Sequence, residues 1–163
     1  MVTRVLFWFG FWAFLCDQVS KYMVVHVLGL SQIRSIDVLP PILNFRYGEN
    51  HGINFGLFSG GDAATRWILI GLSLVVICGV VYWVARWHRD WRMLAAAGLL
   101  VGGALGNVVD RLLYGYVLDF LNMSCCGIDN PFVFNIADVF IFAGALGLIL
   151  FEKPKKKGSK KAS

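Results

Sequence analysis

Four long apolar stretches dominate the hydrophobic pattern of this 163-residue chain. They cover residues 5–28, 67–85, 93–113 and 135–151. Each is close to the roughly 20 residues that a helix needs to cross a bilayer. The pattern therefore predicts an all-α membrane protein built as a bundle of four transmembrane helices.

Two segments on the same side of the predicted bundle, residues 29–66 and 114–134, are too long to be simple turns. The first contains ILNFRYGENHGINFGLF (residues 42–58), where alternating apolar positions and Gly/Asn turn signals predict short strands. We expect these strands to form a small β-rich extracytoplasmic platform at the membrane surface. The second segment is expected to be a short loop that joins the third and fourth spans.

The overall composition also indicates a membrane protein. The chain is 58% hydrophobic and 15% charged, with a mean hydropathy of +0.66, whereas a soluble domain is usually about 45–50% apolar and about 25% charged. The net charge of +5 does not predict nucleic-acid binding, because six of the fifteen Lys and Arg residues lie at positions 153–163. We expect a single domain over residues 1–152, followed by a basic, disordered cytoplasmic tail over residues 153–163.

Lys and Arg residues beside the predicted spans indicate the orientation of the bundle. Arg4, the segment RWHRDWR (residues 86–92) and the lysine tail fall on one side, and only Arg34, Arg46 and Arg66 fall on the other. Cytoplasmic segments of membrane proteins carry an excess of Lys and Arg. Both termini are therefore expected to be cytoplasmic.

Polar side chains from three predicted spans reach a similar depth. Asp17 lies about 18 Å along the first span, and Lys21 follows one turn later. Asn107 and Asp110 lie about 21 and 25 Å along the third span. The fourth span runs in the opposite direction, so Asp138 in its first turn reaches the same outer level.

Charged groups within a membrane must face the bundle interior or a wet cavity, since each costs about 2.5–3.5 kcal/mol at the bilayer centre. Structural ion pairs between Asp17 and Lys21, and between Asp110 and Arg111, are one interpretation of these residues. Asn107 fits either a structural role or the orientation of a substrate. A stripe of small residues on the third span predicts close helix packing at Gly98, Gly102 and Gly106.

Asp119 and Asp138 lack an adjacent cation in the sequence and lie at the two ends of the expected loop. Two carboxylates in one site do not both ionise readily, so one stays protonated. Such a pair supplies a base to activate water and an acid to protonate a leaving amine, as in aspartic proteases. A proton or cation relay in a small transporter uses similar groups, and the spacing alone leaves both functions open. His and Cys spacings typical of metal sites do not occur, so no metal or cofactor is expected.

Four motifs in this chain resemble those of the lipoprotein signal peptidase (signal peptidase II) family. They are DQVSK (residues 17–21), ENHGINFGLF (49–58), GGALGNVVDRLLYGYVLDF (102–120) and FNIAD (134–138). They occur in the family's order, one or more near each predicted span, and the resemblance extends over nearly the whole chain up to residue 152.

The resemblance implies a monomeric aspartic endopeptidase of the bacterial inner membrane that contacts membrane lipid and has its active site near the outer leaflet surface. The family cleaves lipid-modified prolipoproteins just before the modified cysteine and is inhibited by globomycin. Its catalytic aspartates correspond to Asp119 and Asp138. Further positions that shape the site or bind substrate or inhibitor correspond to Asp17, Lys21, Asn50, Gly103, Asn107, Arg111 and Asn135.

The distribution of acidic residues favours the peptidase over a transporter. A conduction path would place acidic groups through the depth of the membrane, whereas eight of the ten Asp and Glu residues lie in outer segments or at outer helix ends. The adjacent Cys125 and Cys126 match no family motif, and we assign them no role.

Overall fold

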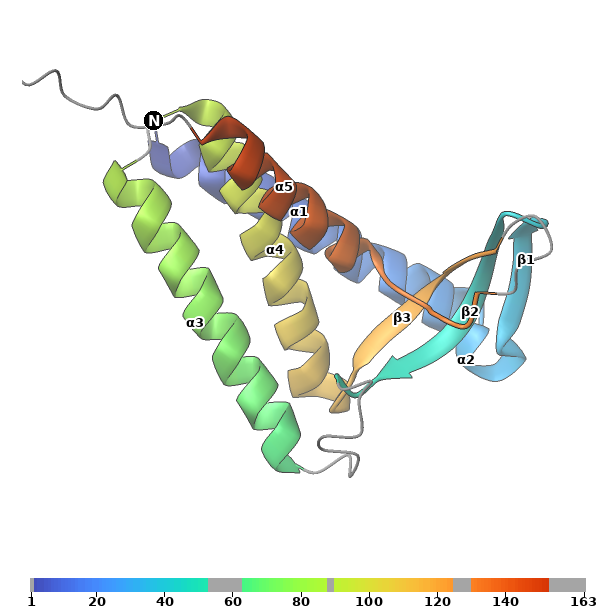
Figure 1. The fold of residues 1–163 in the computed structure, drawn as a ribbon. Helices are drawn as coiled ribbons and strands as arrows, with labels where there is room; N and C mark the ends of the chain where they lie inside the picture. Colours follow the sequence, from blue (N-terminus) through green and yellow to red (C-terminus); the bar gives the residue numbers. More distant parts are fainter. Residues whose placement is uncertain (1, 53–62, 88–89, 125–129, 153–163) are drawn as a thin grey trace, which may run out of the picture.

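A computed structural model describes residues 2–52, 63–87, 90–124 and 130–152 of the chain. Helices pack together at one end and a small antiparallel sheet lies at the other (Figure 1). The fold is therefore mostly helical with a β-rich end, as the sequence predicts. The long helices are α1 (Val2–Lys21), α3 (Ala63–Trp87), α4 (Trp91–Tyr114) and α5 (Ile136–Phe151).

Each predicted span overlaps one of these helices, but the first span is not α-helical throughout. After α1 the chain continues as a π-helix, η1 (Tyr22–Val27), and then as the short helix α2 (Leu30–Ile33). Gly29 separates them with φ +70°, a conformation that glycine adopts without steric cost. Within the described residues, α3 and α4 are long and apolar enough to cross a membrane, and α5 is a shorter apolar helix.

Helix α4 lies between α1 and α5, and glycines bring the backbones close together. A Cβ added at Gly98 would lie 2.6 Å from the Leu6 carbonyl oxygen of α1. On the other side, a Cβ at Gly144 of α5 would lie 2.6 Å from the Ala96 carbonyl oxygen of α4. The predicted packing role of the glycine stripe is confirmed, and the close contacts fix where polar groups on the three helices meet.

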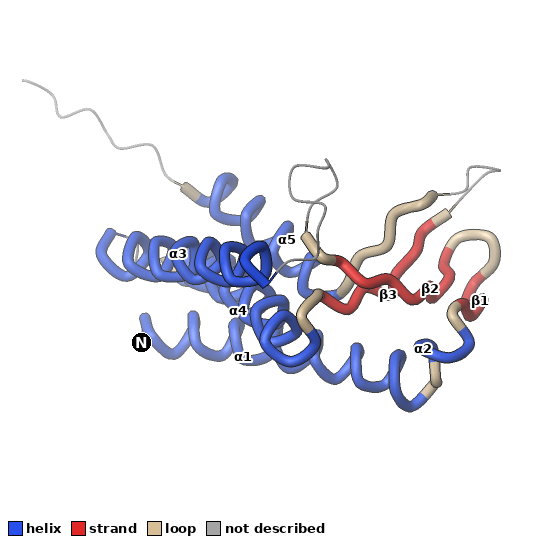
Figure 2. The backbone as a smooth tube through the Cα atoms, turned by 90° about the horizontal axis from the view of Figure 1, so that it is seen from below, coloured by secondary structure: helices blue, strands red, loops and turns tan. Residues whose placement is uncertain are grey.

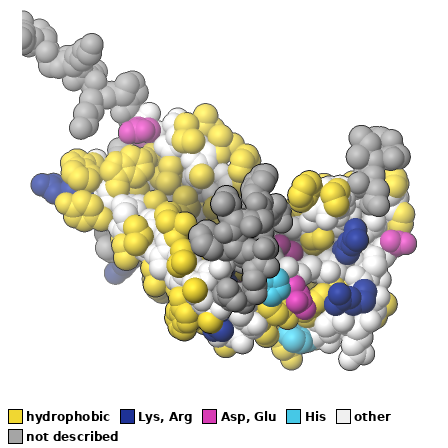
Figure 3. Space-filling view, turned by 60° about the horizontal axis from the view of Figure 1, so that its bottom comes forward, with side chains coloured by type: hydrophobic (Ala, Val, Ile, Leu, Met, Phe, Trp, Pro, Cys, Tyr) yellow, Lys and Arg dark blue, Asp and Glu magenta, His cyan; other side chains and the backbone are white. Residues whose placement is uncertain are grey.

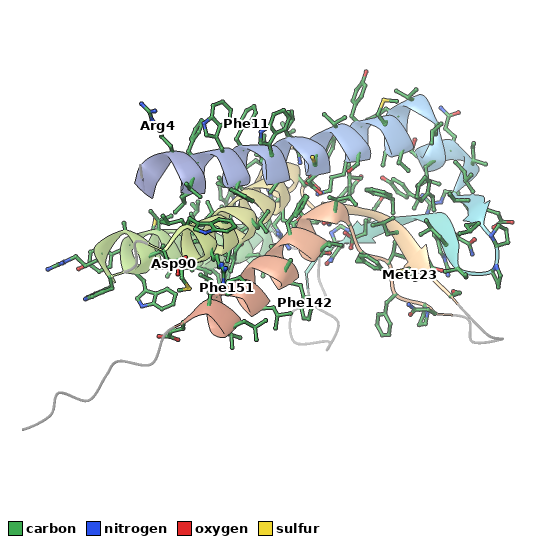
Figure 4. The ribbon with its side chains drawn as sticks, turned by 90° about the horizontal axis from the view of Figure 1, so that it is seen from above. Arg4, Phe11, Asp90, Met123, Phe142 and Phe151 are labelled. Carbon is green, nitrogen blue, oxygen red and sulfur yellow. The ribbon has the colours of Figure 1, made fainter. Side chains whose placement is uncertain are left out.

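The outer surface of the helices is apolar. Hydrophobic side chains cover most of the helical part, which carries charged side chains at its far end, and further charged side chains lie on the sheet side (Figure 3). Phe11 of α1 and Phe142 of α5 point away from the bundle (Figure 4) and are exposed. Helix α3 packs against α4 through the cluster around Ile77 and leaves most of its own side chains exposed. This is the surface expected of helices in contact with lipid.

The sheet consists of β1 (Ser35–Leu39), β2 (Leu43–Asn50) and β3 (Val117–Met123), in the order β1-β2-β3 (Figure 2). Strand β2 lies within the stretch predicted to form strands, of which residues 53–58 fall outside the described residues. The predicted loop between the third and fourth spans is wrong at its start, because β3 occupies it. Four successive β3 residues are buried, so their pattern does not alternate as in a strand with one wet face.

The two ends of the helical bundle differ in the chain segments that meet there. The start of α1, the end of α3, the start of α4 and the end of α5 gather at the end opposite the sheet (Figure 1). Arg4, Asp90 and Phe151 lie at this end, and Met123 lies at the sheet end (Figure 4). Residues 125–129, which include both adjacent cysteines, and residues 153–163 lie outside the described part of the chain.

Candidate active site

Asn135 forms hydrogen bonds with both Asp119 and Asp138. Asp119 lies in the middle of β3 and is 3% exposed, and Asp138 lies in the first turn of α5. The Asn135 side-chain nitrogen donates a hydrogen bond of 2.6 Å to Asp119 Oδ1. The Asn135 backbone N–H donates to Asp138 Oδ2 at 3.3 Å. One residue thus contacts both carboxylates that the sequence predicts to share a site.

The start of α5 explains why a carboxylate opens an otherwise apolar helix. Asn135 is the N-cap, and its side-chain oxygen accepts a 2.9 Å hydrogen bond from the Asp138 backbone N–H. Asp138 in turn accepts from the Asn135 backbone, which completes a capping box. The negative charge also lies at the positive end of the helix dipole. Formation of the helix therefore holds the Asp138 side chain in one orientation.

Two further asparagines donate to the carboxylate oxygens that Asn135 does not contact. Asn50, at the end of β2, donates a 3.0 Å hydrogen bond to Asp119 Oδ2. Asn107 of α4 donates a 2.9 Å hydrogen bond to Asp138 Oδ1. Its amide oxygen accepts at 3.3 Å from Asn135 and at 3.3 Å from Lys21. All four carboxylate oxygens therefore have defined hydrogen-bond donors from β2, α4 or the start of α5.

Lys21 forms a buried ion-pair network directly behind the asparagines. Its Nζ lies 2.8 Å from Asp17 Oδ2 and 2.7 Å from Asp110 Oδ2, and all three side chains are at most 3% exposed. The predicted pair between Asp17 and Lys21 is confirmed. Asp110 forms its direct ion pair with Lys21 of α1 rather than with its neighbour Arg111, because successive residues of a helix point about 100° apart.

The same network joins four elements of the fold. Asp17 Oδ1 accepts from the Ala137 backbone N–H of α5 at 2.9 Å, and Asp110 Oδ2 accepts from the Leu118 backbone N–H of β3 at 3.0 Å. The Gln18 side chain donates to Asp17 at 3.1 Å and to Asp110 at 3.0 Å. Sequence reasoning missed Gln18, although it lies within the DQVSK motif. Its amide completes the hydrogen bonding of two buried carboxylates.

The remaining predicted site residues, Gly103 and Arg111, line the α4 side of the site. A Cβ at Gly103 would lie 2.5 Å from the Ala137 carbonyl oxygen, so only glycine lets α5 begin this close to α4. Arg111 is half-buried and donates a 3.3 Å hydrogen bond to the Asn107 carbonyl oxygen. Its guanidinium lies 3.5 Å from the position that a Cβ at Gly52 would occupy. Arg111 thus places a positive charge between α4 and the chain that leaves β2.

A cavity of about 380 Å³ opens beside Asp119. Its walls come from the end of β2, including Asn50, and from residues 131–133, which precede α5. Asp119 thus forms part of the wall of a cavity on the sheet side of the site.

The pKa of Asp119 is raised to about 7, mainly by burial and secondly by the nearby Asp138 carboxylate. Hydrogen bonds from Asn50 and Asn135 oppose this rise. Asp119 therefore exchanges its proton near neutral pH, which suits a general acid or base. Within the described residues, no group of three or more His, Cys, Asp and Glu residues is arranged to hold a metal ion.

The family model for signal peptidase (SPase) II matches residues 10–152. The chain belongs to the signal peptidase II family. A lipoprotein signal peptidase from Alteromonas mediterranea is 40% identical over 153 residues, which cover 92% of this chain and 82% of that protein. A lipoprotein signal peptidase from Caulobacter vibrioides is 42% identical over 137 residues, which cover 82% of this chain and 77% of that protein.

Solved structures support the fold and a membrane location. Two structures described as bacterial membrane enzymes superpose with TM-scores of 0.75 and 0.76 at 28% and 29% sequence identity. The first comparison covers 93% of each chain, and the second covers 89% of this chain and 90% of the other. This signal peptidase II is thus a membrane protease, as the resemblance of its motifs predicts. The roles of its individual residues stay predictions.

Proposed function

We propose that this signal peptidase II is an aspartic endopeptidase of the bacterial inner membrane that removes signal peptides from diacylglyceryl-modified prolipoproteins. Cleavage falls just before the lipid-modified cysteine. The relatives carry the name lipoprotein signal peptidase, which supports this substrate class. The observation that carries the mechanism is the contact of Asn135 with both Asp119 and Asp138.

The two carboxylates divide the proton transfers of peptide hydrolysis. The ionised member takes a proton from water as the water oxygen attacks the scissile carbonyl carbon. The protonated member donates a hydrogen bond to the carbonyl oxygen as negative charge develops there. A proton then passes to the amine nitrogen as the carbon–nitrogen bond breaks. The raised pKa of Asp119, about 7, supports this division, because Asp119 can then both hold and release a proton near neutral pH.

The surrounding polar residues position the pair. Asn50, Asn107 and Asn135 donate to the carboxylate oxygens and restrict their rotation. Asp17 and Lys21 act one layer further out, through the backbone of α5 and the amide of Asn107. We assign these residues positioning roles. Gly103 permits the close approach of α5, and Arg111 supplies a cation beside the site.

The four long helices are proposed to cross the membrane, with both termini in the cytoplasm and the sheet outside. The apolar outer surface of the helices (Figure 3) and the position of the first turn of α1 and the last turn of α5 away from the sheet (Figure 1) support this arrangement. A diacylglyceryl cysteine keeps its acyl chains in lipid while its peptide bond meets water. A site at the junction of helices and sheet, near the outer leaflet surface, satisfies both requirements.

Cleavage of matched substrates tests this function. The purified enzyme is incubated with one prolipoprotein in its lipid-modified and unmodified forms, and cleavage is followed by mass spectrometry. We expect cleavage of the modified form alone, before the modified cysteine, and competition by globomycin. Cleavage of neither form, together with ion flux in proteoliposomes, would instead support the transporter. Size measurement in detergent tests the expected monomer.

Reporter fusions test the proposed topology independently. Fusions at His88 and after Lys161 should report the cytoplasm, and a fusion near Gly60 should report the opposite side. A fusion at His88 that reports the outside would contradict the four-span arrangement.

A further inference from the structure

The end of the bundle opposite the sheet carries two arginines that lie against aromatic rings. The Arg92 guanidinium of α4 lies 5.9 Å from the ring centroid of Trp91 and 5.8 Å from that of Phe151 in α5. The Arg86 guanidinium, near the end of α3, lies 6.0 Å from the ring centroid of Trp87. These are the distances of cation–π contacts. Because Phe151 belongs to another helix, tertiary packing helps to hold Arg92 at the start of α4.

The same rings and guanidinium groups are accessible from outside. Trp87 and Trp91 are 56% and 58% exposed, and both arginines are exposed. Helix α3 ends at Trp87 and α4 begins at Trp91, and both helices are long and apolar enough to cross a membrane. Trp side chains are enriched where such helices leave the hydrocarbon, at the level of the lipid headgroups. We therefore treat as one arginine–tryptophan surface the residues Arg86, Trp87, Trp91, Arg92 and Phe151.

Positive charge gathers in the chain segments that flank these helix ends. Residues 1–4, 86–92 and 152–163 contain ten of the fifteen Lys and Arg residues but two of the ten Asp and Glu residues. The two acidic residues are Asp90 and Glu152. Asp90 caps α4 and accepts a 3.0 Å hydrogen bond from the Arg92 backbone N–H. The net charge of these segments therefore favours an anionic partner.

We propose that the arginine–tryptophan surface binds the headgroups of anionic phospholipids. A guanidinium group donates paired hydrogen bonds to phosphate oxygens, and the exposed rings pack against the glycerol and upper acyl chains of the same lipid. A zwitterionic lipid carries a cation that offsets its phosphate, so it binds these arginines less well. Each Arg near an anionic membrane surface contributes up to about five-fold in binding, and salt weakens the attraction. The surface lies at the opposite end of the bundle from the sheet, so this binding does not depend on the chemistry of Asp119 and Asp138.

Competition between two lipids tests this proposal. The purified enzyme in detergent is mixed with equal amounts of phosphatidylglycerol and phosphatidylcholine that carry the same acyl chains, and native mass spectrometry gives the ratio of the two lipids bound. The test variant combines Arg86→Gln with Arg92→Gln. The matched control combines Arg34→Gln with Arg46→Gln, because both arginines are exposed at the sheet end and the change in net charge is the same. We expect wild type and control to prefer phosphatidylglycerol, and the test variant to lose most of this preference, up to about five-fold for each arginine.

Further variants separate lost charge from lost structure. Arg86→Lys combined with Arg92→Lys keeps the charge and should keep most of the preference, and the same loss as in the glutamine variant would contradict binding by charge. An equal loss in the control would attribute the preference to net charge alone. Loss of the preference on removal of residues 154–163, with both arginines present, would assign it to the lysine tail instead. A wild-type ratio near one would overturn the proposal.

Discussion

The side-chain nitrogen of Asn135 lies 2.6 Å from the carboxylate of Asp119, although 16 residues of chain separate them. The same side chain caps α5 through its oxygen, which accepts from the Asp138 backbone. Asn135 therefore joins the strand that carries one carboxylate to the helix that carries the other.

Removal of either titratable group should abolish cleavage. Asp119→Asn and Asp138→Asn each keep the size of the side chain but remove a carboxyl group that can accept and donate a proton. We expect a loss of at least about 10²–10⁴-fold in kcat, because a positioned acid or base contributes this much. The double variant should be scarcely worse than either single one, since members of a pair act as a unit. The measurement is cleavage of a lipid-modified substrate at matched folded concentration. Robust turnover by either folded single variant would rule out the pair.

Substitutions at Asn135 should separate its two contacts. Asn135→Ser keeps an N-cap oxygen but loses the amide that reaches Asp119. We expect Asn135→Ser to retain most of its stability and lose activity. Asn135→Ala should lose activity and also about 0.5–2 kcal/mol of stability, the usual value of an N-cap. Thermal unfolding in detergent and cleavage assays measure the two effects. Full activity in Asn135→Ser would show that the contact with Asp119 does not matter.

Asp119 should make the protein less stable as the pH rises toward neutrality. Its pKa is about 7 in the folded protein and 3.8 in the unfolded reference. Its contribution to stability is therefore fully present below about pH 3.8 and is lost as the pH rises through about 7. Relative to wild type, Asp119→Asn should gain stability between pH 5 and pH 8. Thermal unfolding across this range measures the difference, and Asp37→Asn is the control. A constant difference at all pH values would contradict the raised pKa.

Loss of Lys21 should destabilise the helical bundle strongly. Lys21→Met leaves Asp17 and Asp110 buried without their cation. Breaking a buried ion pair from one side costs about 3–5 kcal/mol. Adding Asp110→Asn should recover part of this loss, because one unpaired charge is removed. Equilibrium unfolding in mixed micelles compares the variants. A loss below about 1 kcal/mol would mean that the network is solvated rather than buried.

Two helix glycines should respond differently to alanine. A Cβ at Gly102 would collide with the Gly10 carbonyl oxygen, whereas one at Gly79 would meet nothing within 4 Å. Gly102→Ala should therefore push α1 away from α4 and reduce both stability and activity. Gly79→Ala should be neutral or slightly stabilising, because alanine is the better helix former by about 1 kcal/mol. Equal effects of the two substitutions would contradict the close α1–α4 packing.

The sequence predicts the helices well because their apolar runs are long, and its motifs point to Asp119 and Asp138. Strand β3 escaped prediction because it is buried on both faces and lacks alternation. The Lys21–Asp110 pair depends on how α1 and α4 are rotated against each other, which spacing along one helix does not show. The capping box was readable in principle, since Asn135 and Asp138 have its characteristic spacing.

The capping box at the start of α5 ties the direction of the Asp138 carboxylate to the turn of the helix. Each residue of an α-helix advances the side-chain direction by about 100°. A single residue inserted between Asn135 and Asp138 would therefore turn the carboxylate out of the site or unwind the first turn. The chain directly before Asn135 is fixed as well, because the Phe134 backbone is hydrogen-bonded to Leu121 of β3 and Asn122 donates to the Phe132 carbonyl oxygen. Changes in chain length between β3 and α5 should accordingly fall before residue 130 and not between residue 130 and Asp138.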